Sequence, residues 1–364
     1  VAQYAQVVTN LAQSESLPPF DRSAIAALAE HGARIAARQG KLTARFGRIA
    51  DIAAEAAHIA STQSNPGPDS RRTRGADPAD PMTVTGEQVD RAIQNTRQRA
   101  SLPSRKFREY VEKGTIRVET TGKVVGQING LAVMHSGPLT YGFPARITAT
   151  IGPGRAGLIN IEGQARMSGS IHTKGFHILG GLLRQLLKTE HPLAFSASLA
   201  FEQSYGGIDG DSASGAEIVC LLSALTGVPV KQGMAMTGAI DQMGNLEAIG
   251  GVNEKIEGFF DACEYFGFTG DQGVVIPSAN AGDLMLRQDV VDACHENRFR
   301  VHAIDNIHHA LELMTGTPVG RLDESGKYPE GTLLATAHQQ VENYWRLSLA
   351  SPDKRAAAEP EVQT

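Results

Sequence analysis

The chain has 364 residues, of which 41% are hydrophobic and 20% charged, and this balance predicts a soluble globular protein of two or three domains. Its net charge of −5 argues against a protein that mainly coats nucleic-acid phosphates. The sequence contains neither an apolar run of about 18 residues, which a membrane span needs, nor a basic-then-apolar leader.

Cysteine and histidine usage limits the expected cofactors. Cys220, Cys263 and Cys294 are odd in number and form no C-x-x-C pair. We therefore expect no disulfide framework, no thiolate zinc site and a reducing, cytoplasmic setting. The histidine pairs have no ligand-like spacing and no third partner, so we expect no metal site.

Residues 1–60 predict three helices of a small bundle, because Ala-rich amphipathic patterns alternate with brief breaks. Either Asp21 or Ser23 caps the second helix, and Gly40 separates it from the third. Segment 61–81 is rich in Pro, Gly, Ser and charge without periodicity, which predicts a flexible linker or long loop.

A fourth helix should follow this linker and return to the bundle. Thr85 and Gln88 have the spacing of a capping box in front of "EQVDRAIQNTRQRA". We therefore assign 1–60 and 82–113 to one helical subdomain.

From about residue 114 the pattern predicts a mixed α/β domain that extends to 316. The extension 317–364 should hold one more helix and a disordered tail. Within the α/β domain we expect a hairpin around "TTGK" and another across 234–251, strands at 145–151, 158–167, 192–201, 273–277 and 300–304, and helices at 176–189, 216–226, 253–266 and 308–314.

Two Gly-rich stretches resemble nucleotide-binding loops but lack their context. "GPGRAG" at 152–157 fits G-x-G-x-x-G, but a strand should follow it in place of the helix that binds a pyrophosphate, so we expect a tight hairpin turn. "GMAMTG" at 233–238 has P-loop glycines, but Ala239 and Ile240 replace the Lys and Ser/Thr that hold phosphates and Mg²⁺. We therefore expect no nucleoside-triphosphate site in this chain.

The stretch "GIDGDSASGAEIVC" at 207–220 offers a nucleophile. Ser214 and Glu217 have the S-x-x-E spacing of a capping box, which would occupy the Ser214 hydroxyl. Ser212 lies just outside that helix, where N–H groups and the positive end of the helix dipole stabilise an oxyanion. A serine nucleophile also needs a base to take its proton.

The stretch "GGVNEKIEGFF" at 250–260 offers that base as Lys255. If Asn253 caps the helix, Lys255 falls in the first turn, where the helix dipole and burial both lower the pKa of its ammonium group. A partly neutral lysine can serve as a general base. The alternative is a solvated first-turn lysine without a catalytic role.

Three stretches in order, "FEQSYGGIDGDSASGAE", "AMTGAIDQMGNLEAIGGVNEKIEGFF" and "GVVIPSANAGDLML", resemble the proteolytic domain of Lon-type proteases, nearest the LonB-like branch. The resemblance covers 114–316 and implies an α/β (α+β) fold related to the GHMP kinases. That family uses a Ser-Lys dyad, whose positions match Ser212 and Lys255.

The same resemblance implies roles for three neighbouring residues. The family threonine matches Thr237, whose hydroxyl is expected to orient the lysine. Asp209 and Asp211 match the acidic positions before the nucleophile, and one of them is expected to support the lysine or the loop. The familiar branch reads K-D-G-P-S where this chain reads I-D-G-D-S, which favours the LonB-like branch.

The N-terminal helices resemble the lid subdomain of an AAA+ module, in which an arginine senses nucleotide; Arg45 and Arg48 are both candidates. The resemblance places an ATPase core, with its ATP and Mg²⁺, upstream of Val1, which agrees with the absent Met and P-loop. It also implies a homo-hexameric ring that degrades unfolded proteins, with no membrane partner. It leaves nucleic-acid binding open.

The expected activity is that of a Ser-Lys endopeptidase whose extended substrate pairs with a strand edge, such as that of 124–134. One rival is a GHMP-type kinase, but Asp211 stands where such a loop leaves bare backbone for phosphates. The other rival is a non-catalytic ring-forming scaffold, which requires a blocked groove or a Lys255 side chain turned away.

Overall fold

The computed structural model describes residues 2–64, 82–137 and 139–350, and the chain divides into two compact units, each with its own hydrophobic core. The first unit is Val1–Glu109 with His135–Thr140 and Gly282–Met285. The second comprises Tyr110–Met134, Tyr141–Ala281 and Leu286–Thr364. No helix among the described residues has the length and hydropathy that a membrane crossing requires.

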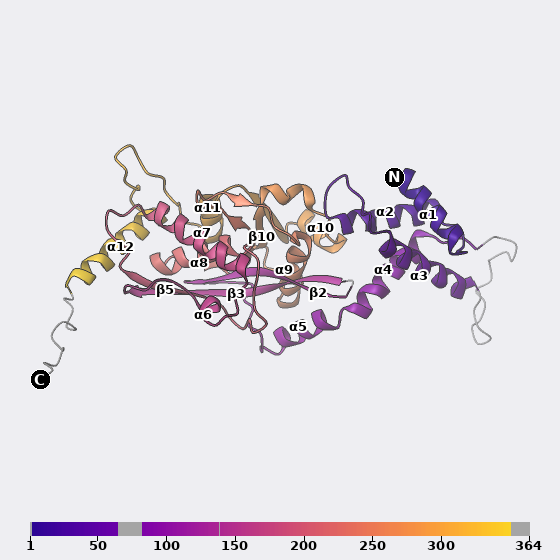
Figure 1. Ribbon diagram of the computed structural model, residues 1–364, viewed down its shortest axis with the longest axis horizontal. Coiled ribbons are helices and arrows are strands. Elements are labelled where there is room, and N and C mark those ends of the chain that lie inside the picture. Colours follow the sequence, from indigo (N-terminus) through magenta and orange to yellow (C-terminus); the bar gives the residue numbers. More distant parts are fainter. Residues whose placement is uncertain (1, 65–81, 138, 351–364) are drawn as a thin grey trace, which may run out of the picture. The chain divides into compact units, whose positions relative to one another are not determined.

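The first unit is helical, as predicted (Figure 1). Its core is formed by apolar stripes that include Leu28, Ile49 and Val89. Its helices are α1 (Ala2–Ser14), α2 (Arg22–Ala36), α3 (Phe46–Ser64) and α4 (Gly86–Ala100), and α5 (Leu102–Glu112) follows them.

The predicted helix starts in this unit are confirmed. Asp21 caps α2 by accepting the Ala24 N–H at 2.8 Å, and Thr85 and Gln88 form a capping box in front of α4. Helix α3 continues through Ser64, so the first residues of the predicted linker are helical. The rest of that linker lies outside the described residues.

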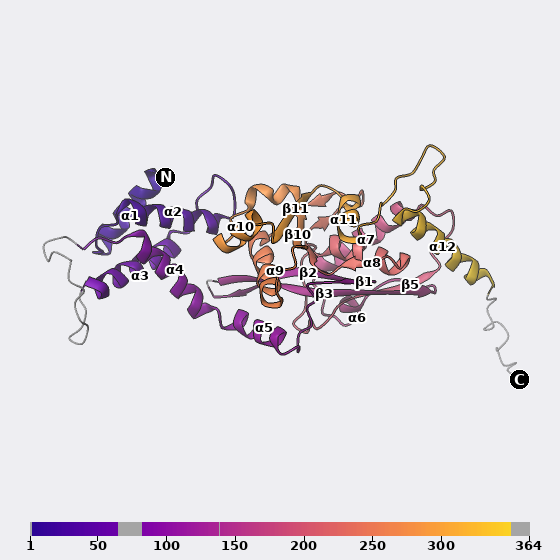
Figure 2. The same ribbon diagram turned by 180° about the vertical axis from the view of Figure 1, so that it is seen from behind.

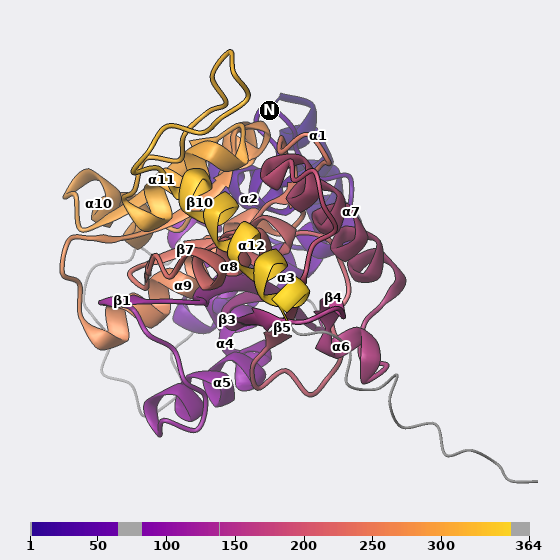
Figure 3. The same cartoon turned by 90° about the vertical axis from the view of Figure 1, so that its left-hand side faces the viewer.

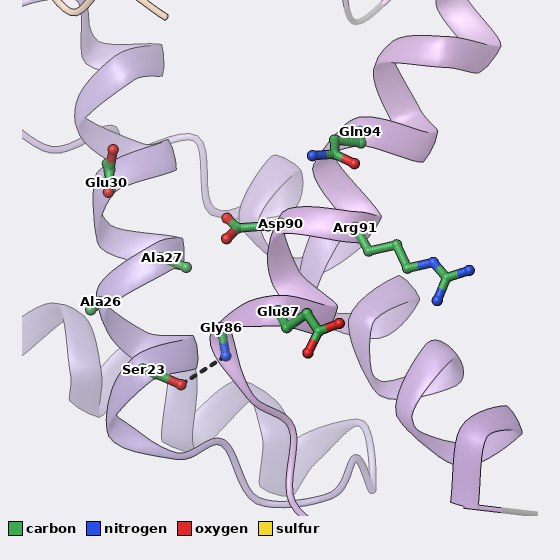
Figure 4. A pocket seen from close by; sticks show the side chains of 9 residues that line it. All are labelled: Ser23, Ala26, Ala27, Glu30, Gly86, Glu87, Asp90, Arg91 and Gln94. Carbon is green, nitrogen blue, oxygen red and sulfur yellow. Dashed lines mark hydrogen bonds between the residues drawn. The ribbon is translucent and has the colours of Figure 1, made fainter. Parts of the chain in front are cut away.

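A groove of about 810 Å³ lies between α2 and α4 (Figure 4). A hydrogen bond from Gly86 N to Ser23 Oγ (2.8 Å) ties the two helices together at one end of it. Acidic side chains dominate its charged rim, since three carboxylates and one guanidinium line it: Glu30, Glu87, Asp90 and Arg91.

The second unit is built on a seven-stranded sheet among the described residues, in the order β11-β10-β7-β2-β3-β5-β4. Strands β2, β7, β10 and β11 run parallel, whereas β5 pairs antiparallel with β3 and parallel with β4. The strands are β2 (Gln127–Ser136), β3 (Leu139–Pro153), β4 (Gly157–Asn160), β5 (Phe195–Phe201), β7 (Met234–Met236), β10 (Gln272–Pro277) and β11 (Phe299–Ile304).

Helices α7, α8, α11 and α12 pack together on one face of this sheet and bury the main core (Figure 3). Helix α9 packs against β10 (Figure 2). The helices are α6 (Ile161–Gln164), α7 (Ser170–Leu187), α8 (Ser214–Thr226), α9 (Val252–Phe266), α10 (Gln288–His295), α11 (Ile307–Thr315) and α12 (Leu333–Ala350), with a 3₁₀ turn at Ser278–Asp283.

Most predicted elements of this unit are present, but the two short-range hairpins around "TTGK" and "GPGRAG" are wrong. The predicted strand 158–167 is also wrong beyond Asn160, because Ile161–Gln164 form α6. Strand β1 (Lys123–Val124) pairs with the distant β6 (Val230–Lys231). The turn at "GPGRAG" joins β3 to β4, and β5 lies between them. In the predicted hairpin 234–251, only β8 (Ala239–Ile240) and β9 (Leu246–Glu247) pair with each other.

The C-terminal helix is also present, as α12. The predicted disordered tail lies beyond Ala350, outside the described residues.

Candidate active site

The structure brings Ser212 and Lys255 together from positions 43 residues apart in the chain. Ser212 lies in the turn before α8, and Lys255 lies near the start of α9. The Lys255 Nζ is 2.8 Å from the Ser212 Oγ, which is hydrogen-bond distance. A proton can therefore pass directly between the two groups.

Thr237 joins the lysine to the backbone of the serine. Its Oγ1 lies 3.1 Å from Lys255 Nζ and donates to the Ser212 carbonyl at 3.1 Å. The Gly238 N–H donates to the same carbonyl at 2.7 Å. The turn between β7 and β8 thus fixes both members of the pair.

Burial makes the Lys255 ammonium group lose its proton more easily than that of an ordinary lysine. The residue is 3% exposed, and burial lowers its pKa to about 8, while the charge of Asp211 acts in the opposite direction. At that pKa roughly one lysine in ten is neutral at pH 7, against about one in three thousand at the ordinary value.

The predicted cap of this helix is wrong. Helix α9 begins at Val252 after Gly251, which has φ 68°, so Asn253 is the second helical residue rather than the cap. The Lys255 N–H already donates to the Gly251 carbonyl at 3.0 Å, inside the helical ladder. The lowered pKa of Lys255 has burial as its cause, and the helix dipole is not needed to explain it.

Two glycines let α9 approach the sheet closely. A Cβ on Gly142 of β3 would lie 2.0 Å from the Glu254 carbonyl oxygen, and a Cβ on Gly258 would lie 2.1 Å from the Gly142 carbonyl oxygen. No ordinary side chain fits at either position. This backbone-to-backbone contact packs β3 against the stretch of α9 that carries Lys255.

The capping box predicted for Ser214 and Glu217 is also wrong. The Ser214 hydroxyl donates to the Asp211 carbonyl at 2.8 Å and accepts the Ile240 N–H at 3.1 Å. Glu217 points elsewhere, to His172 Nε2 at 3.2 Å. The Ser214 hydroxyl is occupied, as expected, but by different partners.

The two acids before Ser212 have different surroundings. Asp209 accepts the N–H groups of Gly210, His172 and Ile171, and these bonds lower its pKa. It therefore caps the start of α7. Asp211 supplies the negative charge that Lys255 senses.

Two backbone N–H groups beside the serine have no acceptor in the described part of the chain. Among the described residues, the N–H groups of Ser212 and Ala213 donate to no acceptor, whereas that of Ser214 is bound to the Asp211 carbonyl. An oxyanion hole requires two such groups, so these N–H groups could hold an oxyanion if Ser212 attacks a carbonyl.

The remaining predictions concern nucleotide sensing and metal binding. Arg45 precedes α3 and Arg48 lies in its first turn, and both are exposed. In the part of the chain that the structure describes, no three His, Cys, Asp or Glu side chains gather as metal ligands would.

Sequence reasoning missed His172. Its only signal was Glu217, whose buried carboxylate needs a partner, but the S-x-x-E pattern assigned that carboxylate to a helix cap.

Comparison with known proteins adds two family matches. Residues 102–315 match the Lon protease (S16) C-terminal proteolytic domain, and residues 19–66 match the archaeal LonB AAA+ ATPase lid domain.

Curated relatives agree with these matches. A protein of Escherichia coli named as a putative Lon protease homolog is 42% identical over 64% of this chain and 40% of its own length. A protein of the same name from Haemophilus influenzae is 44% identical over 60% of this chain and 36% of its own length. An archaeal Lon protease of Thermococcus kodakarensis is 26% identical over 84% of this chain and 43% of its own length. The chain thus spans less than half the length of each of these relatives.

Proposed function

The chain belongs to the Lon protease family, and from this premise we propose that it is a serine endopeptidase with Ser212 as nucleophile and Lys255 as general base. The observation that carries the proposal is the 2.8 Å separation of Lys255 Nζ and Ser212 Oγ. A non-catalytic scaffold with the lysine turned away would not need this geometry.

In the proposed reaction, the neutral Lys255 amine takes the Ser212 hydroxyl proton as Oγ attacks the scissile carbonyl carbon. The N–H groups of Ser212 and Ala213 hold the resulting oxyanion. The Lys255 ammonium then gives its proton to the departing amine, and an acyl ester remains on Ser212. Lys255 takes a proton from a water as that water attacks the ester carbonyl, and it returns the proton to Ser212 Oγ as the acid is released.

Thr237 orients the base during this cycle. Its hydroxyl proton is used by the Ser212 carbonyl, so its oxygen can only accept from the Lys255 amine. One N–H of the amine is thereby fixed, which directs the lone pair to the Ser212 hydroxyl.

We propose unfolded protein segments as substrates. Strand β2 pairs with β7 only at Asn129 and Gly130, because β7 ends at Met236, and β2 continues beyond it. Val133 on this continuation lies against Gly251, at the start of the helix that carries Lys255. An extended peptide added to that edge would pass the dyad, and such pairing reads backbone rather than side chains.

The wider biology is proposed from the family. The lid match supports an ATP-dependent enzyme that works as a homo-hexamer, with ATP and Mg²⁺ bound by an ATPase portion outside residues 1–364. We propose a cytoplasmic location, which suits the three free cysteines.

The test is casein degradation by the complete natural protein and its Ser212→Ala variant, with and without ATP, together with labelling by a fluorophosphonate probe. We expect Ser212→Ala to abolish cleavage and labelling while the melting temperature stays unchanged. Full activity in Ser212→Ala would refute the nucleophile. A wild-type protein that neither cleaves casein nor reacts with the probe would support the scaffold.

A further inference from the structure

His172 holds both ends of the segment that carries the proposed nucleophile. Its backbone N–H donates to the Asp209 carboxylate at 3.2 Å, three residues before Ser212. Its Nε2 contacts Glu217 Oε1 at 3.2 Å, five residues after Ser212. The other ring nitrogen, Nδ1, lies 2.9 Å from Ser168 Oγ. One residue of α7 therefore binds the loop before the nucleophile and the helix after it.

Helix α7 also lies directly against this loop. The Gly169 N–H donates to the Ile208 carbonyl at 2.8 Å, and the Ile208 N–H donates to the Met167 carbonyl at 2.9 Å. Further along α7, a Cβ on Gly175 would lie 3.0 Å from the Asp211 Cβ. Because no bulky side chain separates helix and loop, a shift of α7 moves the loop with it.

The pair of His172 and Glu217 is buried, and its surroundings favour a protonated histidine. Each side chain is 3% exposed, and the imidazole and the Phe201 ring form a T-shaped pair with 5.5 Å between ring centroids. Burial opposes protonation of His172, but the acids that face it, Glu217 from α8, Glu162 from α6 and Asp209 from the loop, outweigh it and raise its pKa. A buried ion pair adds little net stability compared with apolar packing, so stability alone is a weak reason for it.

We propose that the buried ion pair between His172 and Glu217 is a positioning device for the reaction, which keeps the Ser212 hydroxyl within reach of the Lys255 amine. This inference rests on the proposed function. Among the described residues, no hydrogen bond joins the His172 or Glu217 side chain to the dyad, so the pair acts through α7, α8 and the loop between Ile208 and Ala213. A misplacement of about 1 Å costs about 100-fold in rate.

The experiment compares Glu217→Gln and His172→Gln with a matched control, His177→Gln, whose imidazole is exposed on the same helix. All are made in the complete protein and assayed with a short fluorogenic peptide from about pH 6 to about pH 9. We expect kcat to fall roughly 10- to 100-fold in both pair variants with KM nearly unchanged, and the control to match wild type. We also expect the ratio of wild-type to Glu217→Gln kcat to shrink as pH rises through the raised His172 pKa, because the wild type then loses its imidazolium charge.

Wild-type kcat in Glu217→Gln would overturn the inference, and so would a kcat ratio that does not change with pH, since packing alone would then explain the loss. If His172→Gln fails to fold, Glu217→Gln decides, because glutamine keeps the shape of the side chain. Ser212→Ala separates the two levels. Its full activity would refute the proposed function, whereas its inactivity alongside an unaffected Glu217→Gln would overturn this inference alone.

Discussion

The Thr237→Val substitution tests how the dyad is held together. The Thr237 side chain is fully buried and valine has nearly the same shape, so the change removes one hydroxyl and leaves the packing. The Ser212 carbonyl keeps its bond from Gly238 N at 2.7 Å. The Lys255 amine, which is 3.1 Å from the lost hydroxyl, then keeps only Ser212 Oγ as a hydrogen-bond partner among the described residues.

The expected magnitude follows from that unpaired N–H. A buried donor without a partner costs about 1–3 kcal/mol. Because Lys255 carries its positive charge while Ser212 attacks, this cost falls on the transition state. It corresponds to roughly a 5- to 150-fold loss in kcat. The Thr237→Ser variant keeps the hydroxyl and should stay close to wild type.

The pH dependence gives a second, independent signature. A hydroxyl that accepts from an ammonium group favours the charged form, so its removal lowers the pKa of Lys255 further. The acid limb of the kcat profile should therefore move to lower pH in Thr237→Val even as the plateau falls. Steady-state assays with a fluorogenic peptide and a melting curve for each variant measure both effects. A Thr237→Val plateau equal to that of Thr237→Ser, or an acid limb at higher pH, would refute the orienting role.

A further prediction concerns the base. The acid limb of the wild-type profile should have an apparent pKa near 8, because burial lowers the Lys255 pKa to about 8 and the neutral amine is the active form; a limb near 6.5 would instead point to a histidine.

Periodicity predicted most of the helices and strands, because burial repeats every 3.6 or two residues regardless of partners. It did not predict α5, α6 or α10. It failed where a short strand pairs far along the chain. Lys123 and Val124 pair with β6, about a hundred residues on, and nothing in the local pattern distinguishes that pairing from a hairpin. The same limit explains "GPGRAG", whose flanking strands both pair with β5.

The candidate site was predictable to the level of residues but not of contacts. Motif spacing and family resemblance identified Ser212, Lys255 and Thr237, and the structure brings the three together. The partners of Glu217 and Ser214 were not predictable, because a capping box and a long-range contact use the same residue types. Only the position of α7 shows that Glu217 faces a histidine.

The basis for a neutral lysine changes once the start of α9 is known. With Asn253 as a cap, the helix dipole would share with burial in lowering the pKa of Lys255. Because Lys255 lies inside the helical ladder, its pKa depends on how completely water is excluded. The close contact of β3 at Gly142 covers the backbone of Glu254 and Lys255, far from the motif that identifies the base. The strength of the base is therefore a property of the fold, and substitutions that loosen this contact should raise the Lys255 pKa before they unfold the protein.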